Sequence, residues 1–341
     1  MATIDELDPD TAPDADLAAV WALEVAVERE ALPEEPVFPV EQALVEYRHK
    51  PAYQHRRWWV ARRGGRVVAH AACAFNDLAE NRSHAQVNVM VAPDARRASL
   101  GTTLFGVVLD AAEAWNCSLL DLEARVGGPG APFLQRLGAE LRMVERRSVC
   151  RFDDLDRSLL ESWVRRARER AAGYSLVAWD GPCPDELIEA YSEVRHVMNT
   201  APLEGLQREE DRFTPELCRA AEAARDAQGY DWSTVCARHE GSGELVGYTD
   251  VLFPRNWPVM SHQEDTGVWP KHRDRGLGRW IKAAMALRIL DERPAVRRIE
   301  TWNAGSNEAM LNINVAMGFR PLENWGEWQV ETERARLALA A

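Results

Sequence analysis

The sequence repeats one series of predicted elements, and this repetition constrains the fold more than any other feature. Residues 58–75 hold two β-rich runs separated by a pair of glycines, which is typical of a hairpin, and residues 233–253 have the same form. Residues 87–115 then continue as a strand, a proline, a basic turn, a glycine and a helix, and residues 265–290 do the same. Two distinct features in the same order indicate a duplicated domain.

The basic turn of each copy fits the pattern V-x-P-x-x-R-x-x-G-x-G. The arginines of the pattern, Arg96 and Arg273, are 177 residues apart (273 − 96). The first glycine of the pattern is Gly276 in the second copy, whereas Ser99 stands there in the first. The matching positions are Val91, Pro93, Arg96, Ser99 and Gly101 in the first copy and Val268, Pro270, Arg273, Gly276 and Gly278 in the second.

Each basic turn leads into a predicted amphipathic helix, and each helix leads to another strand candidate, residues 118–126 and 296–303. Each copy is therefore expected to be an α/β unit of the α+β kind with a mixed sheet. We predict an N-terminal domain over residues 1–152, a linker with a helix over 153–174 and a C-terminal domain over 175–335.

Composition bounds the class of protein. With 341 residues the chain can bury two cores, and its net charge of −13 argues against nucleic acid as a partner. Residues 1–30 lack the basic and apolar regions of a signal peptide, and no apolar run reaches the ~20 residues of a membrane span. The six scattered cysteines have no metal-ligand spacing. We expect a cytoplasmic monomer or homodimer with free thiols, no membrane partner and no metal.

The run Arg273–Gly278, between a strand and a helix, is suited to an anion. Unpaired N–H groups and the helix dipole make a helix N-terminus locally positive, and glycines let the backbone approach a diphosphate closely. Arg273 and Arg275 could add charge-assisted hydrogen bonds. The alternative is a tight turn without a ligand. The dinucleotide pattern G-x-G-x-x-G is absent here.

VWPKHRDRGLG resembles the acyl-CoA-binding turn of the GNAT superfamily of N-acyltransferases, and residues 300–321 are similar to the later helix of that superfamily. The whole chain resembles the actinobacterial tandem GNAT proteins of the mycothiol-synthase kind. The resemblance implies an acyltransferase that moves an acyl group, expected to be acetyl, from acetyl-CoA or another acyl-CoA to the amine of a small molecule.

The resemblance also implies roles for single residues. The backbone at Val268 should bind the pantetheine arm and polarise the thioester, the turn should hold the pyrophosphate, and Asn307 should lie beside the arm or simply cap its helix. A second, structural coenzyme could bind the first copy. The implied coenzyme-binding residues are Val268, Arg273, Asp274, Arg275, Gly276, Leu277, Gly278 and Asn307, and in the first copy Val91, Arg96, Arg97, Ser99, Leu100, Gly101 and Thr102.

Acyl transfer to an amine needs a base, and in many GNAT members a carboxylate four residues before the valine supplies it. That position is Glu264 in the second copy, with Asp265 as second choice; neighbouring strand residues should point to opposite faces. Val87 is the matching residue of the first copy, which we therefore expect to be non-catalytic. Asn314 stands where the family has a tyrosine that protonates the thiolate, and it is a catalytic candidate because its amide can hydrogen-bond the thiolate, although it cannot donate a proton.

The acceptor is left open by the sequence. In this fold it should meet the loop 195–215, whose acids Glu204, Glu209, Glu210 and Asp211 either suit a cationic amine or are simply solvated. Two other functions remain. One is a non-catalytic acyl-CoA-binding or sensing protein, and the other is a nucleotide-binding α/β protein with a parallel sheet.

Overall fold

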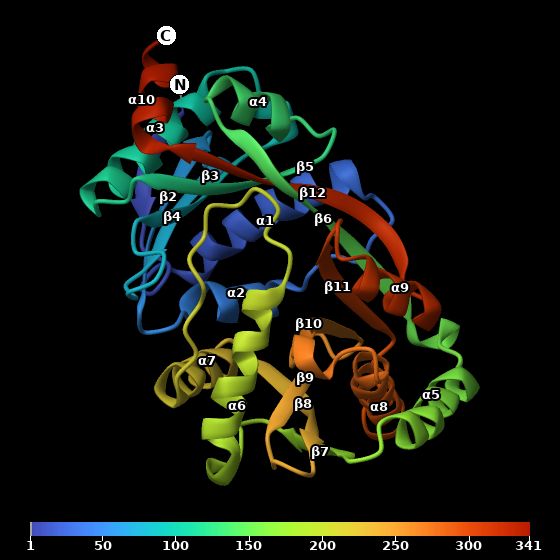
Figure 1. The fold of residues 1–341 in the computed structure, drawn as a ribbon. Helices are drawn as coiled ribbons and strands as arrows, with labels where there is room; N and C mark the ends of the chain where they lie inside the picture. The colour runs from blue at the N-terminus through green and yellow to red at the C-terminus, as the bar shows by residue number, and fades with distance from the viewer. Residues whose placement is uncertain (1) are drawn as a thin grey trace. The chain divides into compact units, whose positions relative to one another are not determined.

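The computed structural model describes residues 2–341, which divide into two compact units. Each unit is a mixed sheet with helices packed on it, as expected of a duplicated α/β domain (Figure 1). One unit holds residues 2–144, 205–209 and 325–341, and the other holds residues 145–204 and 210–324.

The first unit contains one parallel pair of strands, β4 and β5, in an otherwise antiparallel sheet. Strand β3 is buried along most of its length, because α1 and α3 both pack on it. Across the sheet the strands are β1 (Thr3–Leu7), β2 (Gln54–Arg63), β3 (Arg66–Asn76), β4 (His84–Val91), β5 (Leu119–Arg125) and β12 (Arg320–Glu331). The helices are α1 (Asp14–Ala31), α2 (Val40–Arg48), α3 (Leu100–Ala114), α4 (Gly130–Arg136) and α10 (Thr332–Ala340).

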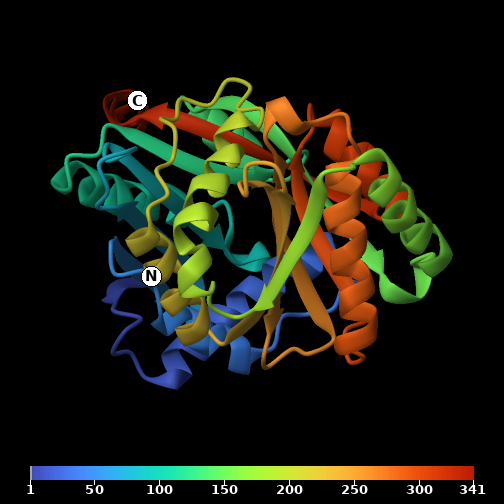
Figure 2. The same ribbon diagram turned by 60° about the horizontal axis from the view of Figure 1, so that its bottom comes forward.

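The second unit repeats this plan, with β10 and β11 as its parallel pair. Every residue of β9 is buried, because α6 covers one face of the sheet and α8 the other, as Figure 2 shows. Across the sheet the strands are β6 (Glu140–Arg151), β11 (Arg298–Ala304), β10 (Met260–Val268), β9 (Leu245–Pro254), β8 (Tyr230–His239) and β7 (Tyr174–Asp180). The helices are α5 (Arg157–Arg170), α6 (Ile188–Arg195), α7 (Pro215–Ala227), α8 (Leu277–Glu292) and α9 (Glu308–Met317).

The last strand of each copy completes the sheet of the other copy. Strand β12 ends the second copy in sequence, yet it pairs with β5, from Trp325 opposite Arg125 to Glu331 opposite Leu119. Strand β6 ends the first copy, yet Arg151 pairs with Arg298 on β11. Each compact unit is therefore assembled from both copies of the repeat.

This exchange moves the domain boundaries predicted from the sequence. The prediction placed residues 145–152 in the first domain and 325–335 in the second, and the structure reverses both assignments. The predicted linker 153–174 belongs to the second unit, because its helix α5 packs along α8 (Figure 1). A strand's sequence does not say which of two equivalent edges it will pair with, so a boundary read from the repeat cannot reveal the exchange.

The local predictions are confirmed. Both hairpins are present, as β2–β3 and β8–β9, and both basic turns end in helices, α3 and α8. All six cysteines are free and buried. Within residues 2–341, no helix is long and apolar enough to cross a membrane.

A close approach at Gly267 in β10 gives a test of the second unit's packing. A Cβ at this position would lie 2.5 Å from Cγ1 of Val197, which is buried. We predict that Gly267→Ala lowers the free energy of unfolding by about 1–3 kcal/mol, measured by urea denaturation. The control is Gly106→Ala in α3, where the Cβ would lie 3.9 Å from Leu339, so stability should hold or rise. Equal stability of the two variants would contradict the packing at Gly267.

Candidate active site

The parallel strands β10 and β11 separate before either of them ends. Their ladder runs from Met260 to Gln263, whereas β10 stays paired with β9 as far as Val268. The β4–β5 ladder of the first unit likewise ends at Val87, although β4 stays paired with β3 as far as Val91. In each unit, backbone groups of the longer strand therefore lack a strand partner on one edge among the described residues, and a ligand can bond to them.

The two predicted pyrophosphate turns have the same backbone conformation. Asp274 and Gly276 are left-handed, with φ of 64° and 82°, and Arg97 and Ser99 of the first unit have φ of 61° and 62°. Such residues turn successive N–H groups toward one side, which forms an anion-binding nest. A left-handed residue other than glycine costs roughly 1–2 kcal/mol, so the first unit retains a strained conformation that a simple connection would not need.

The arginines of these turns hold the turn itself together. Nε of Arg273 donates to the carbonyl oxygen of Val268 at 2.9 Å, and Nε of Arg96 donates to that of Val91 at 3.2 Å. Arg275 folds back and donates to two carbonyl oxygens of its own turn. These side chains thus fix the turn against the end of the strand, and the backbone of the turn stays the predicted anion site. Leu277 and Leu100 are buried, and the small residues Gly278, Gly101 and Thr102 open each helix.

Glu264 and Asp265 form a β-bulge. The register of β10 shifts between Gln263 and Thr266, so that both acids together oppose one residue of β9, Asp250. The predicted alternation of faces does not hold here, because the bulge adds a residue to the strand. The charge of Asp250 therefore acts on Glu264, and that of Asp265 acts on Asp250.

The bulge also corrects the alignment of the two copies. The constant offset of the repeat predicted that Val87 corresponds to Glu264. The β3–β4 register runs without a shift, however, so Val87 corresponds to Gln263. Asn88, opposite Ala72, takes the place of the bulged pair. Since asparagine cannot accept a proton as a carboxylate does, the first copy still lacks an acid at this position.

Two of the three acids at the bulge have cationic partners. Oδ2 of the fully buried Asp250 lies 3.1 Å from Nη1 of Arg225 on α7. Asp265 accepts a hydrogen bond of 2.6 Å from the hydroxyl of Tyr248 and lies 3.4 Å from Arg195 on α6. Burial raises the pKa of the Asp250 carboxyl, and the Arg225 guanidinium opposes this.

Glu264, the third acid, has no hydrogen-bond or ion-pair partner among residues 2–341 and keeps an exposed surface. Desolvation by the surrounding protein raises its pKa to about 7; the Asp250 carboxylate adds to this and Arg225 opposes it. An unpaired, solvent-reachable carboxyl with a pKa near neutrality is suited to take a proton from an amine.

The same strands carry a second charged network, which was not predicted from the sequence. Nδ1 of His262 lies 3.1 Å from Glu300 on β11, and Arg147 lies 2.8 Å from Glu300 and 2.9 Å from Glu323. Burial alone would raise the pKa of Glu300, but the hydrogen bond from His262 and the charge of Arg147 lower it to about 2. Trp302, which is exposed, lies beside Arg147 on this face. Acidic residues on a strand opposite basic ones are the only local signal for this network.

The two predicted asparagines are both engaged within the protein. The side-chain oxygen of Asn307 accepts a hydrogen bond from the N–H of Met310 and caps α9, so its contact with pantetheine stays a prediction. Asn314 is 1% exposed, and its amide donates to Asn303 at 2.7 Å. Because it presents no donor at the protein surface, we assign it no role toward the thiolate.

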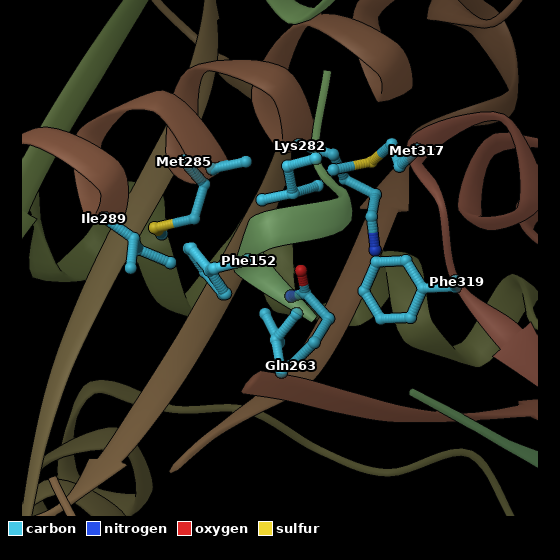
Figure 3. A pocket seen from close by; sticks show the side chains of 10 residues that line it. Phe152, Gln263, Lys282, Met285, Ile289, Met317 and Phe319 are labelled. Carbon is cyan, nitrogen blue, oxygen red and sulfur yellow. The ribbon is translucent and has the colours of Figure 1, made fainter. Parts of the chain in front are cut away.

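The opposite face of the sheet, under α8, holds a small cavity of about 10 Å³, room for one water. Lys282 lines it with its amine near Phe319, and Gln263 points into it from β10 (Figure 3). Burial lowers the pKa of this amine to about 7. The cavity is too small for an acceptor. No cluster of His, Cys, Asp and Glu in the described part of the chain could hold a metal ion.

The predicted acceptor loop divides between the two units. Residues 205–209 belong to the first unit, where Glu209 accepts a hydrogen bond from the N–H of Asn81 at 3.0 Å and donates its own N–H to the Asn81 side chain. In the second unit, Asn199 and Asp211 bond to each other across the base of the loop. Glu209 thus bonds to Asn81 within the protein, whereas the prediction was that it binds a cationic amine or is solvated.

Comparison with known proteins agrees with this geometry. Residues 20–139 match the acetyltransferase (GNAT) family, so the match falls on the first copy. A tandem GNAT protein from the clavulanic acid biosynthesis pathway, solved without acetyl-CoA, is 25% identical over 97% of this chain and 99% of its own, with a TM-score of 0.77. A GCN5-related N-acetyltransferase from Sphaerobacter thermophilus is 17% identical over 96% of each chain, with a TM-score of 0.67. No curated protein matches the sequence significantly.

Residues 20–139 therefore match the acetyltransferase (GNAT) family, and the chain as a whole has the fold of a tandem GNAT protein. Both findings support an enzyme that transfers acyl groups from acyl-CoA. The likeness to mycothiol synthase in particular is not tested by these comparisons and stays a prediction.

The raised pKa of Glu264 predicts the pH dependence of acyl transfer. Below about pH 7 the carboxyl is protonated and cannot accept a proton, so the rate should rise through about pH 7 and then level off. Initial rates of thiol release from acetyl-CoA between about pH 5 and about pH 9 measure this. A rate that is already level from about pH 5 would contradict a base with this pKa.

Proposed function

We propose that the second unit transfers an acyl group, expected to be acetyl, from acyl-CoA to the amine of a small molecule, with Glu264 as the base. The observation that carries this is the unpaired carboxyl at a β-bulge, beside the point where β10 leaves β11. The diphosphate of the coenzyme would lie on the nest Arg273–Gly278, and the pantetheine arm along the free edge of β10.

The reaction follows from these positions. Glu264 removes a proton from the acceptor ammonium, and the freed nitrogen attacks the thioester carbonyl carbon. The N–H of Val268 is suited to stabilise the oxyanion that forms. The C–S bond then breaks, the nitrogen gives up its second proton to water, and the thiolate takes a proton from water, since no side-chain acid is assigned.

The acceptor is proposed to be a small metabolite with an amine. The structural relative from the clavulanic acid pathway, which matches nearly the full length of this chain, supports a metabolic role. The carboxylates of the site would favour a cationic acceptor. The cytoplasm is the proposed compartment, because the six buried thiols are unpaired.

The first unit is proposed to hold a coenzyme without catalysing transfer. Its turn keeps the left-handed residues Arg97 and Ser99, and its strands part in the same way. Asn88 replaces the acids of the bulge, so a bound coenzyme would meet no base there. A coenzyme at this place would stabilise the unit as a structural ligand.

Removing the base tests the reaction. Glu264→Gln should lower kcat by a factor of ~10² or more and leave acetyl-CoA binding unchanged, because the amide keeps the shape and cannot take a proton. Thiol release with a panel of amines measures turnover, and calorimetry measures binding. Glu240→Gln, at an exposed position away from the bulge, is the control. Unchanged turnover of Glu264→Gln would remove this residue from the base role.

A wild-type protein that binds acetyl-CoA but acylates no amine would favour an acyl-CoA sensor.

Two matched variants test the coenzyme sites. Valine strongly disfavours the left-handed conformation, so Ser99→Val and Gly276→Val should each distort one turn. By native mass spectrometry, each variant should lose one of two bound acetyl-CoA molecules, and only Gly276→Val should abolish transfer. A single equivalent in the wild type, unaffected by Ser99→Val, would show that the first turn is empty.

A further inference from the structure

The three carboxylates at the bulge share two guanidinium groups. Arg225, 16% exposed, reaches the bulge from α7, and its partner is Asp250. Arg195 comes from α6 and approaches Asp265. Of these three acids, Glu264 has no ion-pair partner among residues 2–341. The proposed mechanism requires Glu264 to be unpaired.

Pairing with a guanidinium would disable a carboxylate base. A fixed positive charge stabilises the ionised form, so the pKa falls and the driving force for taking an amine's proton falls with it. The charge of Arg225 already reaches Glu264, where it acts to lower the pKa of the carboxyl. Something must therefore keep this guanidinium away from the base.

We propose that Asp250 is a positioning residue, which binds Arg225 and so keeps it from pairing with Glu264. Asp250 is suited to this because the bulge places it opposite Glu264, and it is fully buried at 3.1 Å from Arg225. The mechanism above does not use Asp250, and a fully buried carboxylate needs a reason to be there. The inference rests on Glu264 being the base.

The other charged groups around Glu264 do not take over this role. On β10, Asp265 is held by Tyr248, and His262 is held by Glu300 of β11. On α6, Arg195 lies toward Asp265. Without the Asp250 charge, Glu264 is the unpaired anion on which the charge of Arg225 acts.

The test compares Asp250→Asn with the double variant Arg225→Gln/Asp250→Asn. The asparagine is close to isosteric and releases Arg225 onto Glu264, so kcat should fall about tenfold or more. The acidic limb of the pH–rate profile should also move down by about one pH unit or more. Removing the arginine as well should restore kcat to within about threefold of the wild type, and the pH profile with it.

A merely structural role of Asp250 predicts that the acidic limb of the pH–rate profile stays in place, since the second substitution of a buried ion pair can restore folding by itself. If Asp250→Asn keeps the wild-type kcat and pH profile, or if the double variant is as slow as the single one, the inference is overturned. Glu264→Gln, measured in parallel, separates the two claims, since its full activity would overturn the base itself. Circular dichroism checks folding, and Asp250→Thr replaces Asp250→Asn, with the same expected results, if the latter does not fold.

Discussion

The hydrogen bonding of β10 on one edge only is the constraint on which the site depends. Up to Gln263 the strand is held from both sides, and beyond it only β9 holds it, so its other edge can bind a ligand. The strand stays straight enough to reach the turn because Arg273 ties that turn to the carbonyl of Val268. A strand edge that leads into the N-terminus of α8 gives one extended ligand both backbone hydrogen bonds and an anion site.

The charges around this edge follow from the cost of burying ions. Asp250 and Glu300 are buried, and each is held by an arginine, because an unpaired buried carboxylate would cost several kcal/mol. Glu264 is tolerated without a partner since part of its surface remains in solvent. The surrounding protein still raises the pKa of Glu264, and a substrate can still reach its carboxyl.

The duplicated copies share the backbone features of the coenzyme site and differ in the acids. The left-handed turn persists in the first copy even where serine replaces glycine, whereas the bulge and its acids are absent from β4. The match to the GNAT family falls on residues 20–139, in the copy that lacks the acids. Catalysis depends on a few side chains, which can be lost while the fold is kept.

The sequence by itself determined the repeat, the hairpins and the basic turns, because each of these depends on local periodicity or turn chemistry. Asp250 within the apolar run LVGYTDVLFP was a readable signal of a buried charge, though its partner was not. Only the tertiary structure decided the strand exchange, the bulge and the ion pairs of Arg147 and Arg225. The exchange, the bulge and the ion pairs depend on which strands pair and in what register. Residues that are far apart in the chain determine the pairing and the register.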